Sequence, residues 1–314
     1  MRVDLRIIIV SWNVSVLLDA CLRSIYTEGV GSYSYELVVV ENASSDGSVT
    51  MIRTQYPQAQ LITNNTNLGF TKANNLALIG CKARYALLLN PDTKVTEGAI
   101  QSMLDYMEAH PEVGMVGPRL VYGDDRPQPS RRRFPTLGMA LAESTPWEWH
   151  FPRNRLARAY RLEDRRDDVT QEVDWVTGAC MLVRSEVWEQ VGAFDERFFM
   201  YSEELDWCRR IVAAGWHIVY LPTATVIHYE GASSGQVVAA RSIRFNASKV
   251  HYFLKHHGWL QATIVRVLIL GMFVSEWVIE LLKWLIGHKR SMRLERVRAY
   301  GQVIRSGLRL QAEP

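Results

Sequence analysis

The run LRIIIV at residues 5–10 decides the fold, because it is almost entirely apolar and rich in β-branched side chains. Such a run is typical of a strand that is buried on both faces of a sheet. Residues 14–26 follow with apolar side chains at helical spacing, and residues 35–40 repeat the strand pattern. A buried strand, a helix and a second buried strand predict the start of an α/β fold.

The alternation of strands and helices continues along the chain. Further strands are expected at residues 59–62, 85–89, 113–117, 173–183, 216–221 and 225–229, and further helices from about Ser48, at 71–79, at 97–109 and at 186–191. This order predicts a mostly parallel sheet with helices on both faces. In such sheets, ligands bind beyond the carboxyl ends of the strands.

Composition excludes several classes of protein. A net charge of +3, without a stripe of basic and aromatic residues, argues against nucleic acid as a partner. The four cysteines lack C-x-x-C spacing, which favours reduced thiols of a cytosolic protein over a zinc site or a disulfide framework. Because the sequence starts directly with the strand-like run, we expect no signal peptide.

Three polar loops fall at the predicted carboxyl edge of the sheet. Glu41 follows the second strand, where a carboxylate can accept a hydrogen bond from a base or a ribose hydroxyl. The segment NLGFTKANN at 67–75 contains Gly69 and Asn74, where the backbone must approach a ligand closely. Asp92, in the sequence NPDT, can hold a divalent cation that also binds phosphate oxygens.

Each of these loops also has a purely structural interpretation. Asn42 and Asp46 can cap a helix, the adjacent Asn74 and Asn75 can close a turn, and NPDT can be a β-turn. For any one loop the structural interpretation is favoured. Three such loops at one edge of one sheet shift the balance toward a ligand site.

The stretch FMYSEELDWCRR at residues 199–210 places Glu203, Glu204 and Asp206 between aromatic residues and two arginines. Partial burial among aromatic side chains raises the pKa of a carboxyl group toward the range in which it acts as a base. The alternative is an ordinary acidic first turn, which the helix dipole favours. Which of the three carboxylates would face the substrate stays open.

Further candidates lie on either side of this stretch. Arg132 and Arg133, in QPSRRRFP, could clamp a diphosphate, with solvated surface as the alternative, which is preferred for Arg131. Gly178 would allow close approach of the backbone to a ligand. A histidine at the place of His228 is more often a core or surface residue than a metal ligand.

The motifs, taken in order, resemble bacterial family-2 glycosyltransferases of the GT-A (Rossmann-like) fold. The resemblance covers about residues 5–258 and is nearest to the rhamnosyltransferases that build cell-envelope polysaccharides. It rests on IIIVSWN (7–13), VVENASSDGS (39–48), NLGF (67–70) with the asparagines at 74–75, LLLNPDT (87–93), VTGA (176–179) and FDERFFMYSEELDWCR (194–209).

The resemblance implies roles for individual residues. Asp92 would be the metal-binding end of a D-x-D motif in which Asn90 replaces the first aspartate, and His228, followed by Gly231 and Ser233, would complete the shell of Mg²⁺ or Mn²⁺. Glu204 stands where the family has its catalytic aspartate, with Glu203 and Asp206 as further candidates. The nucleotide-sugar would contact Trp12, Asn13, Glu41 (an aspartate in the family), Asn42, Asp46, Gly69, Asn74, Asn90, Arg132, Arg133 and Gly178.

The implied activity is inverting sugar transfer. The resemblance suggests a rhamnosyl group taken from dTDP-rhamnose to a hydroxyl of a polyprenyl-diphosphate-linked glycan, with Glu204 as the base. One alternative is a scaffold that binds nucleotide-sugars without catalysis. In that case the departures from the family pattern at Glu41, Asn90 and Glu204 would mark the loss of catalytic function. A sugar nucleotidyltransferase is disfavoured, because the loop after the first strand is SWNVS instead of a glycine-rich basic loop.

The C-terminal region, residues 259–314, is predicted to be separate from a catalytic domain at 1–258. Its uncharged core, residues 267–275, is shorter than the roughly 20 residues that a membrane span needs. On a helical wheel its polar residues share one side. This predicts either one amphipathic helix or two helices broken at Gly271, lying in a membrane interface. The basic segment 288–298 suits anionic lipids, so we expect a peripheral protein on the cytoplasmic face of the inner membrane. The alternatives are packing on its own domain or on a second subunit.

Overall fold

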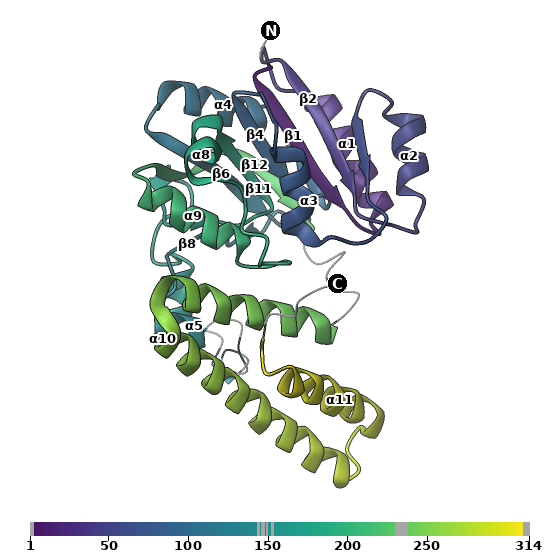
Figure 1. The fold of residues 1–314 in the computed structure, drawn as a ribbon, viewed down its shortest axis with the longest axis vertical. Coiled ribbons are helices and arrows are strands. Elements are labelled where there is room, and N and C mark those ends of the chain that lie inside the picture. Colours follow the sequence, from purple (N-terminus) through teal and green to yellow (C-terminus); the bar gives the residue numbers. More distant parts are fainter. Residues whose placement is uncertain are drawn as a thin grey trace. The chain divides into compact units, whose positions relative to one another are not determined.

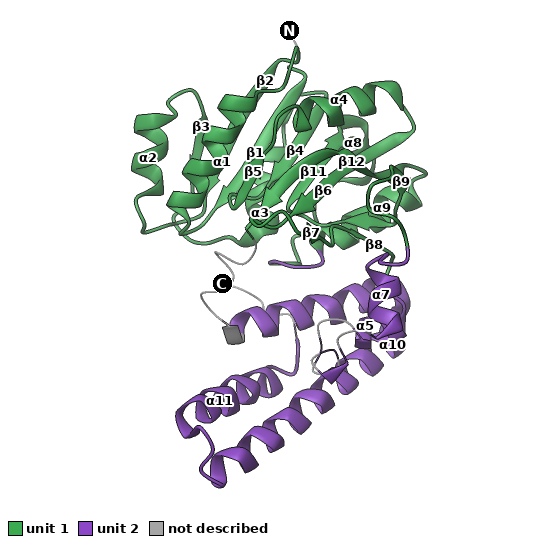
Figure 2. Ribbon diagram, turned by 180° about the vertical axis from the view of Figure 1, so that it is seen from behind, with its two compact units in different colours: residues 1–134, 165–199, 203–233 green, residues 135–164, 200–202, 234–314 purple. Residues whose placement is uncertain are grey.

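The computed structural model describes residues 3–142, 145, 148, 150–151, 154–229 and 238–309. It has two compact units (Figure 2). Unit 1 contains residues 1–134, 165–199 and 203–233, and unit 2 contains residues 135–164, 200–202 and 234–314.

Unit 1 is built on one large sheet. Its strands are β1 (Leu5–Ser11), β2 (Tyr35–Glu41), β3 (Gln60–Thr63), β4 (Tyr85–Leu89), β5 (Thr93–Val95), β6 (Val113–Val121), β7 (Pro127–Gln128), β9 (Gln171–Glu172), β11 (Cys180–Arg184) and β12 (His217–His228). The main path is β3-β2-β1-β4-β11-β6-β12-β5, with β7 beside β6 and β9 beside β12. A separate ribbon pairs β8 (Arg131–Arg132) with β10 (Trp175–Val176).

The strand directions put the carboxyl ends of β1, β2 and β4 at one edge of the sheet. Strands β3, β2, β1, β4, β6 and β12 run one way, and β11 and β5 run the other way. The register pairs Ser11 with Glu41 and Ile9 with Leu89. The mostly parallel α/β sheet predicted from the sequence is therefore confirmed.

Helices cover both faces of this sheet (Figures 1 and 2). They are α1 (Ser15–Glu28), α2 (Ser48–Gln55), α3 (Gly69–Leu78), α4 (Ala99–Ala109), α8 (Ser185–Val191) and α9 (Glu203–Ala213). The main core forms where α1 and α4 bury Leu22 and Met103 against alternate strand residues such as Ile9. On the opposite face α9 buries Cys208, whose Sγ lies 3.6 Å from the Met115 sulfur of β6.

Two of the regions expected to form strands differ from the expectation. The single strand expected at 173–183 is two short strands, β10 and β11, separated by residues 177–179. The two strands expected at 216–221 and 225–229 are one strand, β12, with a shift of register between Leu221 and Thr225. Pro222 lies in that shift, and its missing N–H removes a ladder hydrogen bond, which favours a bulge over a break.

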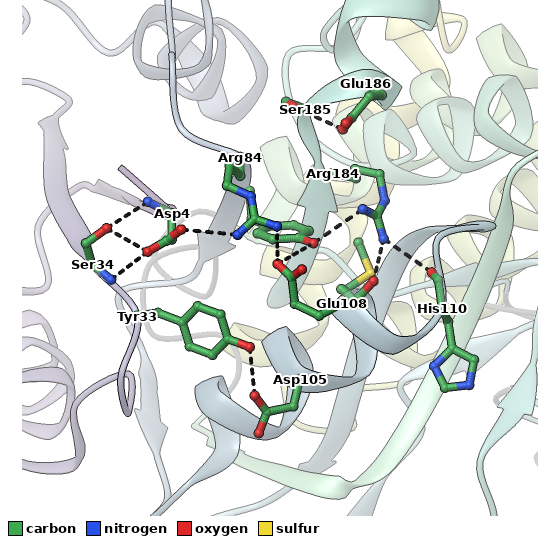
Figure 3. Close-up of polar contacts among 12 residues, drawn as sticks. Asp4, Tyr33, Ser34, Arg84, Asp105, Glu108, His110, Arg184, Ser185 and Glu186 are labelled. Carbon is green, nitrogen blue, oxygen red and sulfur yellow. Dashed lines mark hydrogen bonds and ion pairs between the residues drawn. The ribbon is translucent and has the colours of Figure 1, made fainter. Parts of the chain in front are cut away.

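A network of ion pairs and hydrogen bonds lies at the amino-terminal edge of the sheet (Figure 3). The Arg84 guanidinium contacts Asp4 at 3.2 Å and Glu108 at 2.5 Å. Arg184 donates hydrogen bonds to the backbone carbonyls of Met107 and His110, at 2.5 and 3.2 Å. These contacts join the starts of the strands to the end of α4.

Unit 2 is helical, with α5 (Leu137–Ala142), α7 (Arg155–Tyr160), α10 (Val238–Leu285) and α11 (Arg290–Ser306). Helix α10 changes direction at Gly258, which has a φ of 84°, and it continues through Gly271 without a break. Of the two alternatives, one helix or two helices broken at Gly271, the structure has one continuous helix at this position. Within the part of the chain that the structure describes, one helix is long and apolar enough to cross a membrane, by length and composition alone: residues Ala240–Leu285.

The polar residues of α10 after Gly258 share one side on a helical wheel, but that side does not face water throughout. Glu276 and Glu280 are buried, because α11 packs along this side of α10. The Arg293 guanidinium of α11 donates two hydrogen bonds to the Glu280 carboxylate, at 2.7 and 2.6 Å.

Candidate active site

Asp92 and His228 meet beside the carboxyl end of β4. Antiparallel pairing of β5 with β12 places His228 opposite Thr93, and its Nε2 lies 3.4 Å from the Asp92 Oδ1. The His228 Nδ1 lies 2.9 Å from the Gln128 Oε1 of β7. Because an amide oxygen only accepts hydrogen bonds, this contact places a proton on Nδ1 and leaves Nε2 to face Asp92.

This pair fits a divalent cation. Neighbouring ligands of an octahedral ion with bonds of about 2.1 Å lie about 3 Å apart, close to the observed Nε2–Oδ1 separation. The nearby Asn90 Oδ1 is a buried atom with no hydrogen-bond partner among the described residues. No group of three or more His, Cys, Asp or Glu that could hold a metal occurs within the described ranges.

Glu203 and Glu204 begin helix α9, where two adjacent acids lie at the positive end of the helix dipole. Glu203 is 4% exposed and Glu204 is half-buried. The Oε2 atom of each is buried and lacks a hydrogen-bond partner in the described part of the chain. Buried polar atoms are nearly always paired, so two orphan carboxylate oxygens side by side indicate a place for a ligand.

The two carboxyl groups differ in their surroundings. Burial, followed by repulsion from Glu204, raises the pKa of Glu203 well above its usual range. Burial also raises the pKa of Glu204, but the backbone amides of Glu204, Gly178 and Leu205 and the charge of Arg132 oppose that rise. When one proton is shared between them, these surroundings place it on Glu203 and leave Glu204 as the carboxylate.

The segment of residues 177–179 contacts both the Glu203–Glu204 pair and the turn that carries Asp92. A Cβ added at Gly178 would lie 3.7 Å from the Glu204 side chain, so that carboxylate sits over the glycine backbone. The next residue, Ala179, accepts a hydrogen bond from the Asn90 backbone N–H at 2.9 Å. Glu204 and the Asn90–Asp92 turn therefore flank the same short segment of unit 1.

The three arginines at residues 131–133 make different contacts. The Arg132 guanidinium lies 5.7 Å from the centre of the Trp175 ring, and its charge partly opposes the rise that burial causes in the pKa of Glu204. The Arg133 carbonyl accepts a hydrogen bond from the Trp175 indole at 2.9 Å, which fixes the same turn. Arg131 is buried, not solvated, and it donates to the carbonyls of residues 165 and 166.

Among the described residues, Asp206, unlike Glu203 and Glu204, is paired with an arginine. It is fully buried, and its Oδ2 accepts a hydrogen bond from the Arg210 Nε at 3.0 Å. Arg210 also donates to the carbonyl of Ala193 at 2.8 Å. Through Arg210, this ion pair attaches α9 to the preceding turn. The contacts of Asp206 are therefore those of a structural residue.

The loops after β1 and β2 are tied to each other. Both carboxylate oxygens of Glu41 accept the Ser44 N–H, at 2.9 and 3.1 Å. The Asn13 N–H donates to the Ser44 hydroxyl, and the Asn13 Oδ1 accepts from the Ser45 N–H. Trp12, beside them, is half-buried. The structure brings Trp12, Asn13 and Glu41 together at the carboxyl edge.

Asp46 makes the helix-capping contacts that its structural interpretation predicts. It accepts from the Ser15 N–H at 2.7 Å and from the Ser48 N–H and hydroxyl, so it serves the starts of both α1 and α2. Although burial opposes the change, these hydrogen bonds lower the pKa of Asp46. Asn42 likewise joins neighbouring loops, because its amide donates to the Asn67 side chain and the Gly69 carbonyl.

At Gly69 the residue that approaches the backbone closely is Phe199 of the same protein, and not a ligand. Gly69 has a φ of 80°, and a Cβ there would lie 2.6 Å from both the carbonyl oxygen and a ring carbon of Phe199. Asn74 donates to the carbonyl of Phe70 within α3. Asn75 exchanges hydrogen bonds with the backbone of Phe194. This region positions the segment that leads to α9.

Gln128 was not singled out from the sequence, although it orients His228. The two residues are a hundred positions apart, and only the pairing of β7, β6 and β12 brings them together. No local sequence signal marks that contact. Gly231 and Ser233, expected beside His228, lie outside the described residues.

Known proteins share this sequence pattern. The model of the family described as "Glycosyltransferase like family 2" matches residues 3–244. An N-acetylglucosaminyl-diphospho-decaprenol L-rhamnosyltransferase of Mycobacterium tuberculosis is 34% identical over 244 residues, which are 73% of this chain and 78% of the relative. A low-salt glycan biosynthesis hexosyltransferase of Haloferax volcanii is 26% identical over 88% of this chain and 85% of its own length.

Solved structures share the fold. The mannosyltransferase PcManGT from Pyrobaculum calidifontis, solved with GDP-Man and Mn²⁺, has a TM-score of 0.55 and 14% identity over 98% of this chain and 87% of its own. GalNAc-T7, solved with UDP, GalNAc and Mn²⁺, has a TM-score of 0.59 and 13% identity over 80% and 48%. The sheet, the acidic clusters at its carboxyl edge and the match over most of the chain agree: this protein belongs to glycosyltransferase family 2 and is an enzyme of the GT-A fold.

Proposed function

We propose that this glycosyltransferase moves a rhamnosyl group from dTDP-rhamnose to a hydroxyl of a polyprenyl-diphosphate-linked glycan. The observation that carries the site is the arrangement of Glu204 and the Asp92–His228 pair on either side of residues 177–179. The choice of sugar and acceptor is supported by the name of the mycobacterial relative. The reaction would belong to the synthesis of a cell-envelope polysaccharide.

The proposed chemistry is a single displacement. The Glu204 carboxylate accepts the proton of the acceptor hydroxyl while the acceptor oxygen forms a bond to the anomeric carbon. The bond between that carbon and the diphosphate oxygen breaks, and its electron pair leaves with the diphosphate. Attack from the face opposite the leaving group inverts the anomeric configuration.

The remaining residues bind and orient the donor. Asp92 and His228 would hold Mg²⁺ or Mn²⁺, and such an ion supplies positive charge to a leaving diphosphate. Arg132 adds a positive charge on the Glu204 side of the site. The linked loops at Asn13 and Glu41 would hold the nucleoside, because they present polar groups at the carboxyl edge of the sheet.

The acceptor suggests the place of work. A polyprenyl chain is held in a bilayer, so we place the enzyme on the cytoplasmic face of the inner membrane as a peripheral protein. The four free cysteines are consistent with a reducing compartment.

The test is a panel of nucleoside-diphosphate sugars with a polyprenyl-diphosphate N-acetylglucosamine acceptor and Mg²⁺ or Mn²⁺. We expect a product whose mass increases by one deoxyhexose with dTDP-rhamnose, and whose new glycosidic bond has the opposite anomeric configuration to the donor by NMR. Retention would contradict the single displacement. Transfer of a different sugar would contradict the donor assignment, and nucleotide binding without hydrolysis or transfer would favour the scaffold.

A further inference from the structure

The C-terminal half of α10 carries its charged residues on the inside. Residues 259–286 contain four of them, and of these Glu276 and Glu280 are 9% and 2% exposed while Arg266 and Lys283 are half-buried. The Glu276 Oε1 lies 2.8 Å from the His150 Nε2. Besides its bonds to Arg293, Glu280 lies 3.7 Å from the Lys283 ammonium. The polar side of this helix is therefore occupied by protein partners.

The outward side of the same segment is apolar and carries no charge among the described residues. Its exposed positions are Trp259, Leu260, Thr263, Val267, Leu268, Gly271, Val274, Ser275, Val278, Ile279, Leu282, Leu285 and Ile286. At 1.5 Å per residue this face is about 40 Å long. A helix on a water-soluble surface has the reverse arrangement, with charges outside and apolar residues inside. An exposed, continuous apolar face of this length indicates a surface that binds a membrane or another protein.

Helix α11 limits how α10 can be placed in a membrane. It lies along α10, with Tyr300 5.8 Å from the Phe273 ring and Arg293 bonded to Glu280. Its exposed charged residues include Glu295, Arg296, Arg298 and Arg305, of which Arg296 also lies 3.6 Å from the Glu280 Oε1. A helix with these charges cannot lie in hydrocarbon, so α10 and α11 together cannot both cross a bilayer here. Since α11 packs along the inward side of α10, the charges of α11 do not lie on the apolar face.

The segment that follows the apolar face in the chain is basic. The exposed ionised side chains of residues 287–309 are Lys289, Arg290, Arg296, Arg298, Arg305 and Arg309, against one acid, Glu295. Positive charge beside an apolar face suits a surface that combines acyl chains with anionic headgroups. It does not favour a second copy of the same basic surface.

We infer that the outward face of α10, defined by its exposed residues within 259–286, inserts at the boundary of acyl chains and headgroups of an anionic bilayer. Helix α11 then lies on the water side with its arginines near the headgroups, and the Glu280–Arg293 pair holds the two helices together. This rests on the proposed membrane location, which it deepens by naming the binding face, and it is independent of the sugar that is transferred.

The test is flotation of the full chain with vesicles of phosphatidylglycerol and phosphatidylcholine, and with phosphatidylcholine alone. The wild type should float with the anionic vesicles and float less in high salt. The double substitution Val267→Glu with Leu282→Glu places two charges on the apolar face and should weaken binding by about tenfold or more. The matched control is Ile79→Glu with Val169→Glu, exposed apolar residues of unit 1, which should bind like the wild type.

Two further measurements separate the outcomes. Tryptophan quenching by brominated lipids should fall in Trp259→Phe, which tests insertion without adding charge. Transfer to a water-soluble short-chain acceptor should be unchanged in the double variant, so a failure of membrane binding is distinguished from a failure of the enzyme. Equal flotation of the double variant and its control would overturn the proposal. So would a wild type that never floats but forms a dimer broken by the two glutamates.

Discussion

The two edges of the sheet in unit 1 are both rich in charged side chains, but they use them in opposite ways. At the amino-terminal edge Asp4, Arg84, Glu108 and Arg184 all have partners (Figure 3). At the carboxyl edge the buried oxygens of Asn90, Glu203 and Glu204 have none among the described residues.

The difference separates structure from function. A buried polar group that is paired stabilises the fold. A buried polar group without a partner lowers the free energy of unfolding. A protein retains such a cost where a substrate, a cofactor or a proton completes the arrangement. The comparison therefore predicts that changes at the carboxyl edge reduce activity, and that changes at the amino-terminal edge reduce stability.

The largest expected effect is at Asp92. Asp92→Asn keeps the size of the side chain but removes the charge that would hold a divalent cation, so turnover should fall by roughly a hundredfold or more. Chemical denaturation should show a free energy of unfolding close to that of the wild type. A variant with normal turnover in Mg²⁺ and Mn²⁺ would place the cation elsewhere.

A smaller loss is expected at Gln128, which orients His228 without facing the ligand. Gln128→Leu removes the acceptor for the His228 Nδ1–H, and loss of such a partner weakens metal binding by about 10- to 100-fold. Titration with Mn²⁺ in the presence of a nucleoside diphosphate measures this. Unchanged affinity would mean that the Gln128 contact matters only for packing.

The amino-terminal edge should behave in the opposite manner. Arg184→Met removes the side-chain donor to the carbonyls of Met107, His110 and Val113, which should cost about 1–3 kcal/mol of unfolding free energy. The kcat of the folded enzyme should match the wild type. A loss of kcat larger than the loss of folded protein would break the comparison.

The smallest and most specific effect concerns pH at Glu203. A carboxyl group whose pKa is raised by folding contributes stability at low pH, and that contribution is lost as pH rises through its folded pKa. Glu203→Gln mimics the protonated form, so it should raise the free energy of unfolding at pH 8 and change it little at pH 5. The opposite edge supplies the control, because Glu108→Gln breaks the ion pair with Arg84 and should destabilise at neutral pH. Equal effects of Glu203→Gln at both pH values would contradict a raised pKa.

The sheet could be predicted from sequence because buried strands such as residues 5–10 and 35–40 have a local signature. The acids could also be located, since Asp92 and Glu204 lie in short motifs. Their partners could not be identified in this way. The contact of His228 with Gln128 depends on strand pairing, and the ion pair that occupies Asp206 depends on how α9 packs.

Helix α10 shows the same limit. Periodicity correctly places Glu276 and Glu280 on one side, but a helical wheel does not tell which side faces outward. The presence of α11, with Arg293 directed at Glu280, decides it. Sequence periodicity thus shows which residues share a side of a helix. Tertiary packing determines which side is buried and which is exposed.

The most direct test of the central claim is Glu204→Gln, measured for turnover, donor binding and stability in the same preparation. General-base help contributes roughly a hundred- to ten-thousand-fold in rate, so turnover should fall at least a hundredfold while nucleotide affinity and the unfolding midpoint are not lowered. Turnover near that of the wild type, or a loss explained by unfolding, would contradict the assignment of the carboxyl edge as the active site.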